Sequence, residues 1–121
     1  MRQTMEQKRA AHAWEKARQG VGQHGRDYVN DAKGLPALIM NSGLMQVAAF
    51  LHGKDGRHET LLDHLLDWLH HAMRTPRDFE PFMQHLLNAG PREFQAITTE
   101  AHAWLRWLRQ MAPAVEPGGE G

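Results

Sequence analysis

Segment 63–73, DHLLDWLHHAM, contains the side chains of this chain that come closest to forming a metal site. Asp63, Asp67 and His71 are four residues apart, so on a helix they share one face and could supply part of the ligand set of a divalent cation. The Glu-x-x-His and HExxH motifs of helical metal sites do not occur in the sequence. A small metalloenzyme is one hypothesis. We favour a solvated helix face on which Asp67 and His71 form a pair, with no metal and no other cofactor.

Nucleophilic catalysis has little support either. The sequence contains no nucleophile elbow, phosphate-binding loop or dinucleotide-binding glycine pattern. Ser42 has no base close to it in sequence, and a helix break is the simpler explanation of Asn41-Ser42-Gly43. Cysteine is absent, which excludes disulfide bonds, cysteine-based zinc sites and cysteine nucleophiles. We therefore predict a protein that is not an enzyme and binds no small-molecule substrate.

The charged residues point to a different kind of chemistry, because they are unevenly spread along a chain of zero net charge. Residues 1–26 contain six basic and two acidic side chains, whereas residues 55–80 contain six acidic and three basic ones. This asymmetry suits a subunit that meets a polyanion with one face and a protein with another, although ordinary solvated faces give the same pattern. The zero net charge argues against a free-standing nucleic-acid binder.

Helices must position all of these side chains, because period-two alternation is missing and helix-favouring residues dominate the sequence. Capping patterns, glycines and prolines predict helical segments over about 5–21, 26–33, 36–41, 44–52, 57–74, a short segment ending at 88, and 91–112. The fold class is therefore all-α, a compact bundle of about six helices in a single domain of residues 1–112. Residues 113–121 are predicted to form a flexible C-terminal tail.

Glycine and proline mark the expected boundaries. The first helix is expected to begin with a capping box of Thr4 and Gln7 and to end at three glycines: Gly20, Gly22 and Gly25. Gly34 is expected to stop the next helix, and Pro36 to occupy the first turn of another, where its missing N–H costs little. Gly43 is expected to need a special backbone conformation at a helix break, and Asp55 to cap the helix that begins near residue 57.

The large aromatic residues divide into core and surface candidates. Four of them fall on apolar helical stripes and are predicted to be core residues: Trp14, Trp68, Phe94 and Trp104. Trp107 lies off its stripe and is a candidate for a flank or an interface.

Segment 32–54, AKGLPALIMNSGLMQVAAFLHGK, resembles the most characteristic stretch of one known family. This family is the small helical subunit of the type III-B (Cmr, RAMP-module) CRISPR effector complex. Two weaker blocks flank the segment: a first helix with Ala10, Trp14 and Ala17, and a last block that contains Thr99-Glu100-Ala101 and Trp107-Leu108-Arg109. Gln110 departs from the family, which usually has a basic residue there.

The resemblance implies a non-catalytic scaffold subunit of an RNA-guided antiviral complex. Copies of such a subunit stack head to tail beside the RAMP subunits and line the channel that holds guide RNA and target RNA, while neighbouring subunits cut RNA. The matched positions imply contacts with the RNA backbone at Lys33, Lys54, Arg106 and Arg109. The charge asymmetry adds four candidates: Lys8, Arg9, Lys16 and Arg18.

The expected partners are therefore the other effector subunits, further copies of this chain, guide RNA and target RNA. A helical protein–protein adaptor in an unrelated assembly is the alternative, and composition does not distinguish the two. The N-terminus is polar, and no apolar run approaches the roughly 20 residues that span a membrane. We expect a cytoplasmic protein without a membrane partner.

Overall fold

The computed structural model describes residues 2–116, and this part of the chain forms six helices and no strands. The helices are α1 (Met5–His24), α2 (Arg26–Ser42), α3 (Leu44–His52), α4 (Gly56–Met73), α5 (Phe79–Asn88) and α6 (Pro91–Val115). The predicted all-α bundle of about six helices is confirmed. None of the helices within residues 2–116 is long and apolar enough to cross a membrane.

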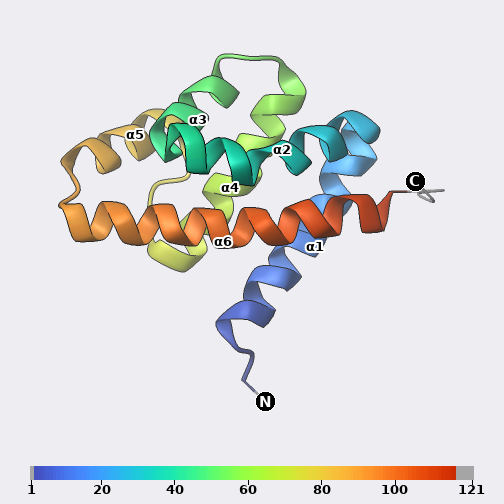
Figure 1. Ribbon diagram of the computed structural model, residues 1–121, viewed down its shortest axis with the longest axis horizontal. Coiled ribbons are helices and arrows are strands. Elements are labelled where there is room, and N and C mark those ends of the chain that lie inside the picture. The colour runs from blue at the N-terminus through green and yellow to red at the C-terminus, as the bar shows by residue number, and fades with distance from the viewer. Residues whose placement is uncertain (1, 117–121) are drawn as a thin grey trace.

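The longest helix, α6, connects most of the bundle, because it packs against α1, α2 and α4. In Figure 1, α2 lies alongside α6, α4 lies behind both, and the first turns of α1 project away from the body. α3 packs against α4 and α5 at the other end. One side of α6 is therefore buried, and the remaining surface is bordered by α1 and α2.

Three local features of the structure agree with the prediction from sequence. The Thr4 N–H donates to Gln7 Oε1 at 2.8 Å and the Gln7 N–H donates to Thr4 Oγ1 at 3.1 Å, which completes the capping box of α1. Asp55 caps α4 through Oδ1, which accepts the His58 N–H at 3.3 Å. Gly43 separates α2 from α3 at φ +87°, where side chains are rarely tolerated, so its predicted special conformation is confirmed.

α2 is one continuous helix, so the predicted stop at Gly34 and the predicted start at Pro36 are wrong. Pro36 lies in the helix interior, where a proline removes a backbone hydrogen bond and costs about 3 kcal/mol. Apolar side chains recur every three or four residues on both sides of it and are buried: Val29, Ala32, Leu35 and Ile39. Burial of this uninterrupted stripe against other helices offsets the local cost, which short-range rules do not include.

α1 also extends farther than predicted, because only Gly25 of the three glycines ends it. Gly20 is buried inside the helix, and a Cβ at this position would collide with the ring of Tyr28. Gly20 is therefore a packing residue that allows α1 and α2 to approach each other closely. Gly22 is exposed, with open space around its missing side chain.

The predicted core is correct for most of the aromatic residues. Trp68 and Trp104 are buried and Phe94 is partly buried, but Trp14 is 41% exposed. The buried face of α1 is instead formed by small side chains: Ala13, Ala17, Gly20 and Val21. The prediction for Trp14 is wrong because α1 packs closely against its neighbours, and such a close contact accommodates small side chains but not a large indole.

The C-terminal boundary differs as well, since α6 continues through Pro113 to Val115 and the predicted tail begins too early. Val115 packs against the core, and Arg26 Nη1 lies 2.9 Å from both carboxylate oxygens of Glu116. These contacts hold the last turn of α6 against the start of α2. The rest of the predicted tail, residues 117–121, lies outside the described residues.

Candidate nucleic-acid interface

An open groove of about 610 Å³ crosses α6 between α2 and the N-terminal half of α1. Basic, polar and apolar side chains line it together. Four of the eight predicted RNA contacts are among them, although they come from three different helices: Arg9, Lys33, Arg106 and Arg109.

Helical periodicity explains why these side chains converge. On α2, the lining residues Lys33, Ala37 and Met40 are three or four positions apart, and on α6 the lining residues Ala103 and Arg106 have the same spacing. α2 and α6 pack side by side (Figure 1), so these two exposed edges face the same space. The groove is thus bounded by two helices whose other faces are fixed in the core.

Lys33, Arg106 and Arg109 are the exposed cations of this groove. Arg109 Nε donates to the backbone carbonyl of Lys33 at 3.2 Å, which positions the guanidinium beside α2 and leaves its two terminal amino groups for another acceptor. Within residues 2–116, no carboxylate lies at ion-pair distance from these three side chains. An anionic ligand would therefore meet cations that are not already neutralised.

Arg9 differs from the other three, because its guanidinium has an internal partner. Its Nε and Nη2 donate to the two carboxylate oxygens of Glu100 at 2.6 and 2.8 Å, and the Trp68 indole N–H donates to Glu100 at 3.0 Å. The hydrogen bonds that Arg9 donates to Glu100 raise the pKa of Arg9, although partial burial opposes the shift. This triad joins α1, α4 and α6, so it gives Arg9 a structural role. Its contact with RNA stays a prediction.

The other four predicted contacts do not line the groove. Lys8 and Arg18 are exposed on α1, and Lys16 Nζ lies 3.7 Å from Asp67. Lys54 follows α3, and its Nζ lies 5.5 Å from the centre of the Phe50 ring. RNA contacts of these residues also stay predictions.

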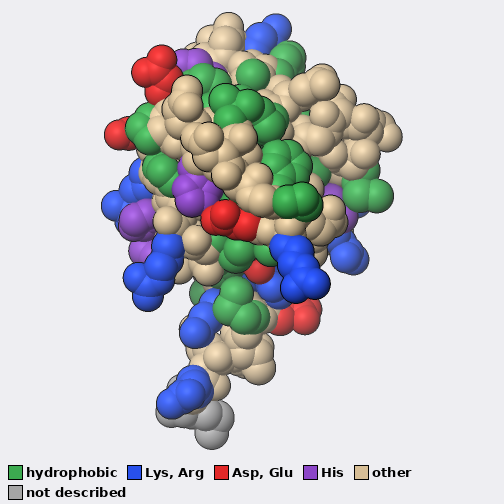
Figure 2. Space-filling view, turned by 90° about the vertical axis from the view of Figure 1, so that its left-hand side faces the viewer, with side chains coloured by type: hydrophobic (Ala, Val, Ile, Leu, Met, Phe, Trp, Pro, Cys, Tyr) green, Lys and Arg blue, Asp and Glu red, His purple; other side chains and the backbone are tan. Residues whose placement is uncertain are grey.

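The charge asymmetry of the sequence is visible on the surface. Figure 2 shows the face at the α5 end, where Lys and Arg side chains lie mainly in the lower half and along the projecting end of α1. Asp and Glu side chains lie at the upper left, in the middle and at the lower right, and hydrophobic side chains cover much of the upper and middle parts of this face. The end with α1 is thus the more basic end of this face.

Asp67 is the centre of the cluster in the metal hypothesis, and it has one histidine partner on its own helix and one on α1. His12 Nε2 lies 2.8 Å from Asp67 Oδ2, and His71 Nε2 lies 3.6 Å from the same oxygen. Within residues 2–116, the group whose potential ligand atoms lie within 4.8 Å of one another is His12, Asp67 and His71, so Asp63 is not part of it. The predicted pairing of Asp67 with His71 is confirmed, and His12 of α1 is an additional member.

The charges around Asp67 favour an ion-pair cluster over a cation site. Arg77 Nε lies 3.2 Å from Oδ1, and Lys16 Nζ lies 3.7 Å from Oδ2. Burial raises the pKa of Asp67, but the hydrogen bond with His12 and the charge of Lys16 outweigh this and hold the pKa below its usual value. A divalent cation would compete with two cations for one carboxylate. The cluster instead ties α1 and the segment before α5 to α4.

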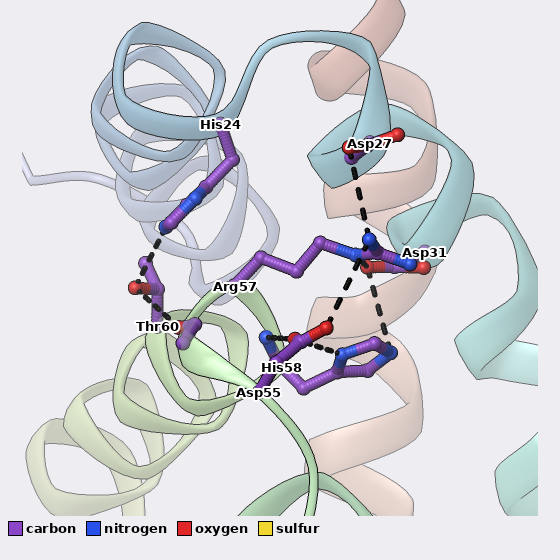
Figure 3. A network of polar contacts seen from close by, with 8 residues as sticks. His24, Asp27, Asp31, Asp55, Arg57, His58 and Thr60 are labelled. Atoms are coloured by element: carbon purple, nitrogen blue, oxygen red, sulfur yellow. Dashed lines mark hydrogen bonds and ion pairs between the residues drawn. The ribbon is translucent and has the colours of Figure 1, made fainter.

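A second internal cluster joins the ends of α2 and α4 (Figure 3). Arg57 Nε donates to Asp31 Oδ2 at 2.8 Å, while Asp27 and Asp55 lie 3.7 and 3.9 Å from its Nη1. His58 Nδ1 lies 2.6 Å from Asp55 Oδ1, and this hydrogen bond lowers the pKa of Asp55. The carboxylates of this cluster are therefore already paired with basic side chains of the same chain.

The pairing of two residues could not have been predicted from spacing along the chain. Glu100 pairs with Arg9 and His12 pairs with Asp67, and these partners are 91 and 55 residues apart in sequence. Trp107, by contrast, lies off the apolar seam and was an interface candidate, and it lines the groove. The sequence signals for the groove were therefore the family resemblance, which selected Lys33, Arg106 and Arg109, and the position of Trp107 off its apolar stripe.

Residues 5–115 match the model of a family described as CRISPR-associated protein (Cas_Cmr5). Among solved structures, the chain is similar to the X-ray crystal structure of a CRISPR-associated Cmr5 family protein from Thermus thermophilus. The two share 28% sequence identity and a TM-score of 0.81, and the match covers 94% of this chain and 99% of that chain. No curated protein matches the sequence.

Proposed function

Because the chain belongs to the Cmr5 family of CRISPR-associated proteins, we propose that it is the non-catalytic small subunit of an RNA-guided type III-B (Cmr) effector complex. Its role is to help hold guide RNA and target RNA by neutralising backbone phosphates. The observation that supports this role is the groove in which Lys33, Arg106 and Arg109 converge without internal carboxylate partners.

A few phosphate contacts per copy are enough if copies stack beside the RAMP subunits, because contacts along one strand add together. This reconciles RNA binding with a net charge of zero. A cluster of three carboxylates supports head-to-tail stacking as well. Burial raises the pKa of Asp63, and the nearby charges of Glu59 and Asp78 raise it further, so these carboxylates offer an acidic patch to a basic face of the next copy.

The internal ion pairs favour a scaffold over an enzyme. Two carboxylates that could serve as acids, bases or ligands instead join separate parts of the fold: Asp67 pairs with His12 and Arg77, and Glu100 pairs with Arg9. The adaptor alternative in an unrelated assembly loses its support, because the family match covers residues 5–115. A cytoplasmic location stays a prediction.

Membership in the complex can be tested by purifying a C-terminally tagged copy from its native host. We expect RAMP-type proteins and a small guide RNA of uniform size to accompany it. A lone protein, or one accompanied by unrelated proteins without RNA, would contradict the proposal.

The groove can be tested in the assembled complex with the triple variant Lys33→Ala, Arg106→Ala and Arg109→Ala. We expect target RNA affinity to fall by at least about tenfold, and the slope of log affinity against log salt to fall by about 0.7 to 0.9 for each phosphate that is no longer neutralised. The matched control is Arg2→Ala with Arg92→Ala, which removes two exposed cations that neither line the groove nor belong to the predicted RNA contacts. Normal affinity and salt dependence in the triple variant would show that the groove does not bind RNA.

A further inference from the structure

The groove contains apolar and aromatic side chains that the neutralisation of phosphates does not require. Besides its three free cations it is lined by Pro36, Ala37, Met40, Ala103 and Trp107. Met40 is 72% exposed, the largest value among the exposed large hydrophobic residues of the described chain. Trp107 packs partly against the core, so its indole has a supported position. An aromatic ring and a thioether beside cations are the surroundings of a nucleobase rather than of a phosphate alone.

We infer that this groove receives one unpaired nucleotide of the bound RNA, with its base against Trp107 and Met40 and its phosphate on Arg106, Arg109 and Lys33. The inference rests on the proposed function, and it specifies that this site recognises an unpaired nucleotide of the RNA. A base that is paired within a duplex has no free face for Trp107, so the nucleotide must be outside base pairing.

The spacing of residues along α6 supports separate places in the groove for the base and for the phosphate. Two neighbouring rows of α6 line the groove: His102, Arg106 and Arg109 form one, and Ala103, Trp107 and Gln110 form the other. Both arginines therefore lie on the same side of a base that stacks on the indole. Arg109 is also held in place by its bond to the Lys33 carbonyl. A guanidinium positioned in advance loses less side-chain freedom when it binds a phosphate.

The size and charge of the groove agree with a nucleotide. Its volume of about 610 Å³ lies within the range of roughly 300 to 1,000 Å³ that is typical of small-ligand sites. The free charge is positive, since Arg9 is neutralised by Glu100 and Glu6 is the one carboxylate among the lining residues. A partner helix would need a longer apolar stripe with anchors over two turns on each side. Base stacking needs one aromatic ring and is tolerant of sequence.

The test is photocrosslinking in the assembled complex, with 5-iodouridine placed at successive positions of the guide or target RNA. We expect one position, or a small set, to crosslink to Trp107, and the crosslink to disappear in Trp107→Leu. We expect Trp107→Leu to lower target RNA affinity about 5- to 100-fold and Trp107→Phe, which keeps an aromatic face, to retain most of it.

A second pair of variants separates binding from folding. Met40→Glu places a carboxylate in the groove at a highly exposed position, so it should lower RNA affinity without changing the melting temperature. Leu87→Glu is the matched control, because Leu87 is 62% exposed and does not line the groove. We expect the control to bind RNA normally.

The outcomes distinguish this inference from the proposed function. If the triple basic variant loses RNA affinity while Trp107→Leu and Met40→Glu bind normally and Trp107 is not crosslinked, the groove binds phosphates only and the inference is overturned. If neither set of variants changes RNA binding, both proposals fail. If Met40→Glu prevents a neighbouring subunit from joining the complex, the groove is a protein-docking surface and the inference is overturned.

Discussion

Two regions of this bundle contain clustered basic side chains and use them differently. In the first, which we name the α1 seam, α1 meets α4 and α6 through the Arg9–Glu100–Trp68 triad and the His12–Asp67 pair. In the second, the groove between α2 and α6, Lys33, Arg106 and Arg109 have no carboxylate partner among the described residues. In these two regions, a cation is therefore free for an anionic ligand only where no acidic residue is buried beside it.

The difference has an energetic reason. A buried carboxylate such as Glu100 needs a paired cation, because an unpaired buried charge costs several kcal/mol. An exposed guanidinium such as Arg109 is well solvated and needs no partner for the fold. Variants of the α1 seam should therefore change stability, and variants of the groove should change RNA binding.

The largest effect is expected for Glu100→Ala in the α1 seam. It leaves Arg9 without its carboxylate and the Trp68 N–H without an acceptor, and we expect the free energy of unfolding to fall by about 3 kcal/mol. Chemical denaturation measures this change. Glu15→Ala, on the exposed side of α1, is the control and should stay within about 0.5 kcal/mol. Equal effects of the two variants would show that the seam does not depend on the ion pair.

The next effect is a pH dependence that comes from His64, which lies beside the seam. Its Nδ1 is 2.8 Å from the hydroxyl of Tyr28, and burial lowers its pKa from 6.5 to about 4, with further contributions from Lys16 and His12. Between these pH values the unfolded chain binds more protons than the folded chain, so stability falls as the pH decreases.

We expect this loss to reach about 3 kcal/mol between pH 6.5 and pH 4. His12, whose pKa is also lowered by burial, contributes in the same direction. Denaturation at a series of pH values measures the slope, which should be smaller in His64→Gln. An identical slope in that variant would refute the assignment to His64.

A smaller change in stability is expected for Gly20→Ala, which tests the packing of α1 against α2. The added methyl group meets the Tyr28 ring, and such overpacking costs about 1 to 3 kcal/mol. Gly22→Ala is a close control two residues away in the same helix, where the space is open and alanine is the better helix former. Thermal unfolding should show a lower midpoint for the first variant and an unchanged or higher midpoint for the second. The reverse order would be incompatible with the described contact.

The smallest effect on stability is expected in the groove. Arg106→Ala and Arg109→Ala should each change the free energy of unfolding by less than about 0.5 kcal/mol, because neither side chain has an internal ion pair within the described residues. Both should still weaken target RNA binding in the complex. A large loss of stability in either variant would remove the distinction between the two regions.

Sequence reasoning succeeded where a feature depends on neighbours along the chain. The capping box at Thr4, the cap at Asp55 and the break at Gly43 were predicted, because each depends on residues within one helical turn. It failed at Pro36, where burial of a long stripe outweighs the local preference of proline. It also failed at Gly20, which it interpreted as a helix end although the residue is a packing contact with Tyr28.

The candidate site was predicted only in part, for a related reason. Lys33, Arg106 and Arg109 were selected by the resemblance, and the structure places them in one groove. Arg9 was selected by charge in the same way as Lys8, although one has a buried carboxylate partner and the other is exposed. Counting charges along the chain does not reveal which of them are already paired.

The amino-acid sequence was sufficient for the helical class, most helix boundaries, the absence of cysteine chemistry and the family to which the chain belongs. The packed helices were needed to establish which basic side chains are free, which helix edges meet in a groove and which histidine joins Asp67. The physical reason is distance along the chain. Helix formation and capping depend on residues a few positions apart, whereas the pairing of Arg9 with Glu100 joins residues 91 positions apart and arises only when the helices pack.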